Sequence, residues 1–197
     1  MAMFGKKKKV DEESTVSDSV APDTFDPKKA KAFFAHARTA HDSGSYEYAM
    51  QCWLNGLRRD PSNMEAFDAY LISSEMYRVE NPKKGVSKET KSAISAKGDI
   101  GKYISALLDL GLKPRDCSIA IKAAQSAGKL GLTDPTRAIG ENALVLAQND
   151  PKQKKEMFVK LLDAFDNAKV YDLAAISGEM ACRLDRSDGD LEVRVRN

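Results

Sequence analysis

Apolar residues recur at helical spacing on both sides of a glycine turn between residues 30 and 63. Phe33 and Ala37 share one helical face, and the pattern breaks at Gly44. A second periodic run follows and ends at Pro61, because proline cannot continue a helix and disfavours helical geometry in the preceding residue. This stretch is therefore predicted to form two helices joined by a tight turn.

Three further helix pairs are predicted from the same periodicity along the rest of the chain. They cover residues 64–116, 118–151 and 152–186. The pair at 64–116 differs from the others because its turn is expanded over residues 81–99. The pattern as a whole predicts an all-α domain over residues 28–186.

The first pair, 34 residues long, resembles a tetratricopeptide repeat (TPR). That family requires a large residue, a small residue four positions later, and then an alanine, an aromatic residue and a proline at fixed offsets. The matching packing positions in this chain are Phe33, Ala37, Ala49, Trp53, Gly56 and Pro61. The later pairs match less well. The resemblance implies a short right-handed α-solenoid of about four helix pairs, and the alternative is an unspecific helical bundle.

The resemblance also implies a function in binding other proteins. The first helix of each pair lines the concave face of such a solenoid, and this face holds an extended or helical peptide. We therefore expect a non-enzymatic scaffold or adaptor whose protein or peptide partner lies in this groove, with Phe34 and Arg38 as anchors. The groove residues implied by position are Lys31, Phe34, Arg38, Asp68, Ile72, Glu75, Val159 and Asp163. For each of them singly, an ordinary solvated helix face is the alternative.

The composition contains little material for catalysis. His36 and His41 are the only histidines, and their spacing of five places them on different faces of a helix, which makes a poor metal pair. The sequence contains no nucleophile elbow, and nothing marks a pair of carboxylates as acid and base. We therefore expect no cofactor, no metal site and no enzymatic activity. Three isolated cysteines without a secretory signal indicate a reducing cytoplasm.

The nearly balanced charge argues against a chain that wraps nucleic acid. Lys and Arg number 31 against 29 for Asp and Glu, and no apolar run is long enough for a membrane helix. Lys6–Lys9 and the basic residues 81–102 still define an alternative function, a regulator at a membrane surface or on nucleic acid. The second segment is rich in glycine and serine and is expected to be a mobile loop. Residues 81–102 lack interleaved aromatic residues, which disfavours nucleic-acid binding. Acidic residues follow Lys6–Lys9 directly, so only a weak contact with a membrane surface is expected there.

Both ends of the chain differ in pattern from the helical region. Residues 1–27 are poor in apolar residues and rich in charge, serine and proline, which predicts a disordered tail. In residues 187–197, Ser187 or Asp188 stands where a helix could be capped, but residues 191–195 alternate between apolar and charged, which favours a strand. We expect such an end to pair with another chain, or to begin a capping element of a longer protein.

Overall fold

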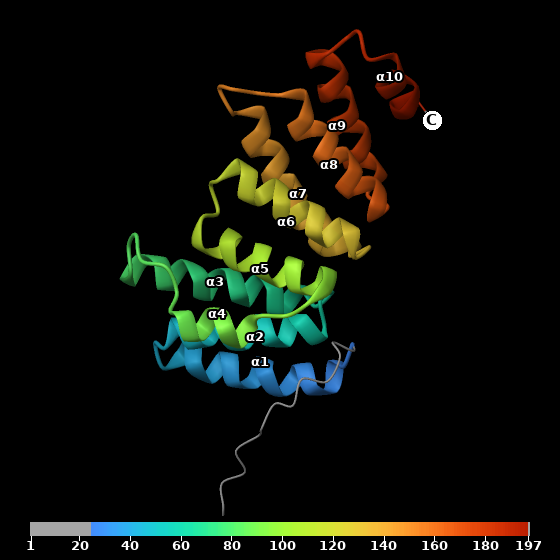
Figure 1. Ribbon diagram of the computed structural model, residues 1–197. Coiled ribbons are helices and arrows are strands. Elements are labelled where there is room, and N and C mark those ends of the chain that lie inside the picture. Colours follow the sequence, from blue (N-terminus) through green and yellow to red (C-terminus); the bar gives the residue numbers. More distant parts are fainter. Residues whose placement is uncertain (1–24, 197) are drawn as a thin grey trace, which may run out of the picture.

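The computed structural model describes residues 25–196 of the chain, and every regular element among them is a helix (Figure 1). This confirms the predicted all-α fold class, while Lys6–Lys9 and most of the predicted tail lie outside the described residues. The ten helices are α1 (Pro27–Asp42), α2 (Tyr46–Arg59), α3 (Met64–Glu80), α4 (Lys88–Ile94), α5 (Gly98–Leu112), α6 (Cys117–Lys129), α7 (Thr133–Gln148), α8 (Lys155–Asn167), α9 (Tyr171–Leu184) and α10 (Gly189–Arg196).

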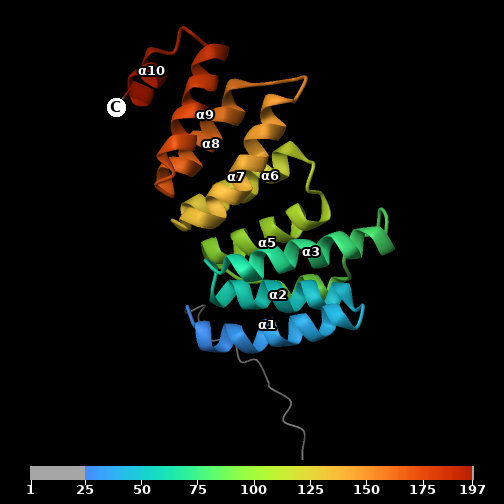
Figure 2. The same cartoon turned by 180° about the vertical axis from the view of Figure 1, so that it is seen from behind.

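Apart from α4, which lies beside α2, the helices follow one another in chain order along the molecule, with α1 at one end and α10 at the other (Figures 1 and 2). They pack in neighbouring pairs, α1 with α2, α6 with α7 and α8 with α9. The pairs are joined because α2 also packs on α3, α5 on α6, and α6 on α8. Within the described part of the chain, no helix combines the length and the apolar character that crossing a bilayer requires.

The first helix pair interlocks through an aromatic ring and a glycine. Phe34 is only 7% exposed, and its ring centroid lies 5.8 Å from that of Trp53. Gly56 makes this approach possible, because a Cβ atom at that position would lie 2.2 Å from Phe34 Cε1. The contact between α1 and α2 therefore depends on the ring lying against bare backbone.

The prediction that Phe34 anchors a partner is wrong, because its side chain belongs to the core. Phe33, predicted to hold the large packing position, is half-buried instead, and the Arg59 guanidinium lies over its ring at 5.2 Å from the centroid. Consecutive helical residues differ in direction by about 100°, so an error of one position exchanges a buried side chain for a more exposed one. The predicted packing positions that are buried are Ala37, Ala49, Trp53 and Gly56.

The segment predicted to be a mobile loop at 81–99 contains the helix α4. Ser87 caps this helix by accepting a hydrogen bond from Thr90 N at 3.1 Å. Val86, Thr90 and Ile94 are buried, and α4 lies against α2. The prediction failed because the segment is rich in glycine, serine and lysine, and only three residues at spacing four, Val86, Thr90 and Ile94, are buried against the rest of the fold.

Glu47, in the first turn of α2, joins α4 to the body of the fold. Its Oε1 accepts hydrogen bonds from Ser87 N at 2.6 Å and from Thr90 Oγ1 at 2.8 Å. Burial by itself raises the pKa of Glu47, but these hydrogen bonds outweigh it and hold the pKa below its ordinary value. The ionised carboxylate is therefore the form that holds α4.

The end of the described chain is also helical, so the predicted strand at 191–195 is wrong. Asp188 caps α10 by accepting a hydrogen bond from Leu191 N at 3.0 Å. Leu191 is buried, and Val195 packs against α9, where a Cβ atom at Gly178 would lie 2.4 Å from Val195 Cγ2. Residues 191 and 195 share a helical face at spacing four, and this contact with α9 decides between the two patterns.

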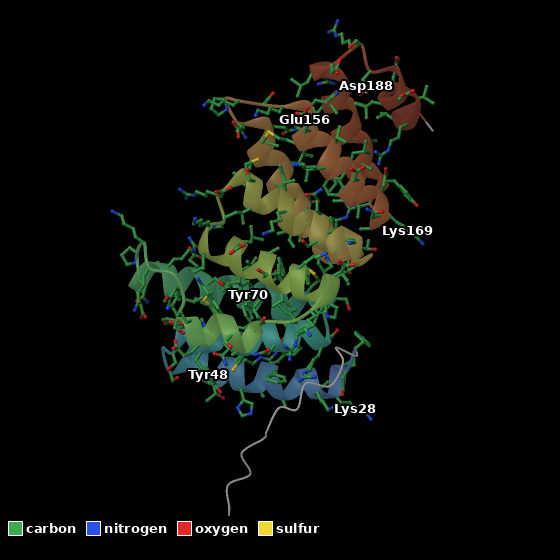
Figure 3. All side chains as sticks on the ribbon, viewed as in Figure 1. Lys28, Tyr48, Tyr70, Glu156, Lys169 and Asp188 are labelled. Atoms are coloured by element: carbon green, nitrogen blue, oxygen red, sulfur yellow. The ribbon has the colours of Figure 1, made fainter. Side chains whose placement is uncertain are left out.

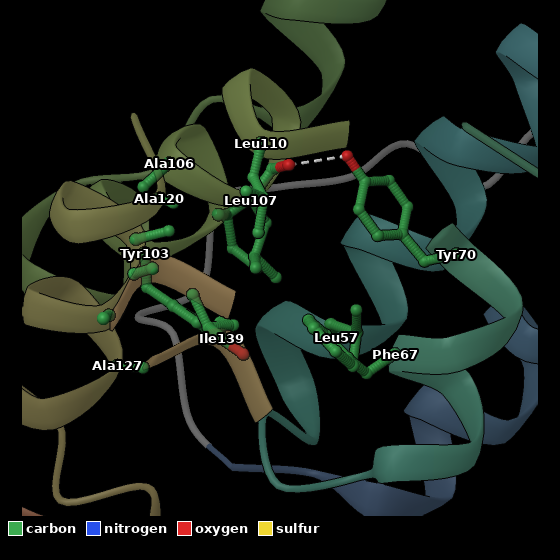
Figure 4. Close-up of a cluster of buried hydrophobic side chains, with 14 of the residues drawn as sticks. Leu57, Phe67, Tyr70, Tyr103, Ala106, Leu107, Leu110, Ala120, Ala127 and Ile139 are labelled. Carbon is green, nitrogen blue, oxygen red and sulfur yellow. Dashed lines mark hydrogen bonds between the residues drawn. The ribbon is translucent and has the colours of Figure 1, made fainter. Parts of the chain in front are cut away.

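Two buried tyrosines near the middle of the molecule differ in their hydrogen bonding. Tyr70 of α3 donates to Leu107 O of α5 at 2.7 Å (Figure 4). Tyr103 of α5 lies in the same apolar cluster, and its hydroxyl has no hydrogen-bond partner among the described residues. The first hydroxyl joins two helices, whereas the second is buried without compensation.

Replacing each tyrosine by phenylalanine is expected to change stability in opposite directions. Tyr103→Phe removes a buried group without a partner and should raise the free energy of unfolding by about 1 kcal/mol, or Tm by roughly 2–4 °C. Tyr70→Phe removes the hydrogen bond that joins α3 to α5 and should lower the free energy of unfolding by about 1 kcal/mol. Thermal and urea unfolding would measure both, and a loss of stability in Tyr103→Phe would contradict the assignment.

Replacing Glu47 by glutamine is expected to loosen α4. At neutral pH, Glu47→Gln should cost about 1–2 kcal/mol, because hydrogen bonds to a charged acceptor become neutral ones. The folded-state pKa is lowered, so the contribution is complete above the ordinary value of 4.5 and is lost as pH falls through the folded value. Urea unfolding from pH 7 to pH 3 should show the two chains converging. Glu89→Gln, an exposed change on α4, should stay within about 0.5 kcal/mol of the native chain at every pH.

Candidate functional site

An apolar stripe on the outer face of α3 is the main exposed feature of the first half of the molecule. Ile72, Met76 and Val79 are 55%, 37% and 70% exposed. They lie at positions i, i+4 and i+7, so they form one row along two turns of the helix. We call this row with its flanking acids the α3 face.

The opposite side of α3 is occupied by the core. Its buried residues meet α2 and α5, and Tyr70 points into the interior (Figure 3). The buried set is Ala66, Phe67, Tyr70, Ser73, Ser74 and Tyr77. The helix therefore carries apolar side chains on two sides, and the fold covers only one of them.

Ser73 fixes the orientation of α3 relative to α1 and α2. Its Oγ accepts a hydrogen bond from Trp53 Nε1 at 3.0 Å and lies 2.9 Å from His41 Nδ1. The same hydroxyl donates to Ala69 O at 3.0 Å, so it is shared by three helices. This network fixes one side of α3 against α1 and α2, while the row at 72, 76 and 79 stays exposed.

Acidic residues border the α3 face. Glu65 is paired with Arg38 of α1, and this pair joins the predicted anchor Arg38 to the edge of the face. Asp68, Glu75 and Glu80 are exposed, and none of them forms an ion pair within residues 25–196. The face therefore combines an apolar row with uncompensated negative charge.

The predicted groove residues divide into three groups in the structure. Asp68, Ile72 and Glu75 lie together on the α3 face, and Lys31 and Arg38 are exposed on α1. Phe34 is in the core. Val159 and Asp163 lie on α8, where Arg194 of α10 contacts Asp163.

The acids of α8 are already engaged by α10. Arg194 of α10 contacts Asp163 at 2.7 Å and Asp166 at 2.6 Å. Lys155, at the start of α8, bridges Asp185 at 2.6 Å and Asp188 at 3.1 Å. The Lys155 ammonium lowers the pKa of Asp185 to about 2, so this connection stays ionised down to acidic pH. Asp163, predicted to line the groove, is therefore paired with Arg194 in the structure, and its role in binding a partner stays a prediction.

Met76 and Val79 are functional candidates that the sequence reasoning missed. Both follow Ile72 on the same helical face, so extending the i, i+4, i+7 row from Ile72 would have found them. They were hidden because α3 has a second apolar row, formed around Phe67 and Tyr70, which matches the packing pattern of a first helix equally well.

Part of the basic segment 81–102, on which the alternative function depends, forms the helix α4. Ser87 and Thr90 are committed to capping α4 and to Glu47. The lysines of the segment remain exposed on its outer side, namely Lys83, Lys84, Lys88, Lys91, Lys97 and Lys102. Among the described residues, no group of three or more His, Cys, Asp or Glu could hold a metal ion, and all three cysteines are free thiols.

Comparison of the chain with protein-family models and with curated proteins finds no match.

Reversing the charge of Arg194 is expected to detach α10. Arg194→Glu places a third carboxylate beside Asp163 and Asp166 and turns two attractions into repulsions. Amide hydrogen exchange at Leu191 should accelerate about tenfold or more, while the amides of α5 stay unchanged. Arg186→Glu, which makes the same charge change at an exposed position before α10, should leave the Leu191 amide protected. Unchanged exchange in Arg194→Glu would show that the ion pairs do not hold α10.

Proposed function

We propose that this chain is a TPR-like helical scaffold or adaptor that binds a peptide or helix of a partner protein at the α3 face. In this proposal the helix pairs form a short right-handed solenoid, and the first helices of the pairs carry the binding surface. In this proposal the chain has no enzymatic activity of its own. Three free thiols fit a reducing cytoplasm as the place of action.

The exposed row of Ile72, Met76 and Val79 carries the proposal. Leaving three large apolar side chains in water along one row forgoes the free energy of burying them, about 1.5–3 kcal/mol for each one fully covered. Neighbouring apolar residues rimmed by polar ones mark interaction surfaces more often than ordinary surface does. A partner that covers the row recovers that free energy.

The packing of the first pair supports the TPR-like part of the proposal. Small residues stand where α1 and α2 approach closely, and Trp53 fills the space between α1, α2 and α3. The connection from α3 to α5 departs from a plain repeat because α4 is inserted between them and braces α2. A braced scaffold keeps α3 in one orientation, which lowers the conformational cost of binding.

Charging the row is expected to abolish partner binding without unfolding the chain. Ile72→Asp/Val79→Asp should weaken the affinity for a partner identified by crosslinking from native lysate by roughly 30-fold or more, as losing two central apolar contacts does. Titration of the purified partner would measure it. Circular dichroism should be unchanged, because exposed positions tolerate substitution.

Val145→Asp is the matched control for this pair of substitutions. Val145 is 54% exposed on α7, close to the value for Ile72, and it is not one of the residues of the α3 face. It should bind the partner as the native chain does. Equal loss in Val145→Asp, or full binding by Ile72→Asp/Val79→Asp, would remove the α3 face from the function.

A further inference from the structure

We infer that the partner segment at the α3 face is an amphipathic helix with apolar residues at i, i+4 and i+7 and with arginine or lysine beside them. This inference rests on the proposed function and specifies its ligand. It follows from two observations, the charge around the face and the way α10 is bound in the same molecule.

The charge of the α3 face selects a basic partner. Asp68 and Glu75 lie along one edge of the apolar row, and Glu80 lies at its end. Arg38 neutralises only Glu65, at the start of the helix. A partner that covers Ile72 and Val79 brings its own flanking side chains against Asp68 and Glu75, so cations there are favoured and carboxylates are repelled.

The contact between α10 and α8–α9 shows what such a complex looks like. Leu191 and Val195, four positions apart, face the α9 side, and Arg194 reaches Asp163 and Asp166 of α8. An acidic pair on one helix thus holds an amphipathic helix by an arginine, while apolar residues at i and i+4 provide the packing. The α3 face presents the same two chemical elements, and no described segment covers them.

The dimensions of the α3 face also favour a helix as the ligand. Ile72 and Val79 are seven residues apart, which is about 10 Å along the helix axis at 1.5 Å per residue. Residues i, i+4 and i+7 of a second helix span the same length, so three apolar pairs can form in register. Arg38 and His41 keep α1 beside α3, so the partner also has a second helix along its side.

The test uses the full chain and a fluorescein-labelled helical peptide of about 15 residues, the length at which isolated helices become stable. The peptide carries leucines at i, i+4 and i+7 with arginines bordering them, and a matched peptide carries glutamates instead of the arginines. Fluorescence anisotropy should show saturable binding of the arginine peptide, and at least about tenfold weaker binding of the glutamate peptide. Ile72→Asp/Val79→Asp should abolish both signals.

A charge exchange then separates this inference from the proposed function. Asp68→Lys/Glu75→Lys should lower the affinity for the arginine peptide by about tenfold and raise the affinity for the glutamate peptide by a similar factor. Glu141→Lys/Glu179→Lys makes the same change in net charge on α7 and α9 and should leave both affinities within about twofold. Rescue of the glutamate peptide by the first variant alone would support the inference.

The remaining outcomes overturn it in distinguishable ways. If both peptides bind with equal affinity and Ile72→Asp/Val79→Asp abolishes this binding, the inferred basic charge of the partner is wrong. The α3 face would then remain the docking surface. A dimer of the chain that Ile72→Asp/Val79→Asp dissociates would show that a second copy covers the face and would overturn a helical ligand. Failure of both peptides to bind would overturn the inference, while the proposed function would still be judged by its own partner titration.

Discussion

The indole of Trp53 is the contact on which the arrangement of the first three helices depends. It lies beside Phe34 in α1, and it donates its N–H to Ser73 in α3. Ser73 in turn lies against His41 of α1, so three helices meet at one buried polar contact within an aromatic core. A buried hydrogen bond of this kind specifies orientation as well as stability, because rotating α3 would leave the buried indole N–H of Trp53 unpaired.

The inserted helix α4 completes the support of this region. It packs on α2, and Glu47 accepts hydrogen bonds from the capping residues of the insertion. The second helix of the first pair is thereby enclosed by α1, α3, α4 and α5. These four contacts make α2 the rigid layer on which α3 rests, although Tyr48 of α2 stays 53% exposed.

The two halves of the molecule present similar acidic helix faces in different states. On α8, Arg194 joins Asp163 and Asp166, and α10 covers the neighbouring surface. On α3, Asp68 and Glu75 stand beside exposed apolar residues without a cation. The contrast supports the proposal that α3 carries the binding surface, and the covered α8 face is the basis for the proposed basic helical ligand.

The sequence by itself determined the helical class, the positions of most helices and the small residues Ala37, Ala49 and Gly56 between α1 and α2. Helical periodicity is a local property, so residues three and four apart reveal a helix wherever it packs. The exposed positions Asp68, Ile72 and Glu75 could be named in advance for the same reason.

Only the tertiary structure decided which of two apolar rows is covered. Phe33 and Phe34 are adjacent, and whether the core receives one or the other depends on the approach of α1 to Gly56. Met76 and Val79 stay exposed because Ser73 and Tyr70 turn the other side of α3 inward. The helical form of α4 and of α10 likewise comes from surfaces that exist only after folding, since segments of seven and eight residues are too short to hold a helix alone.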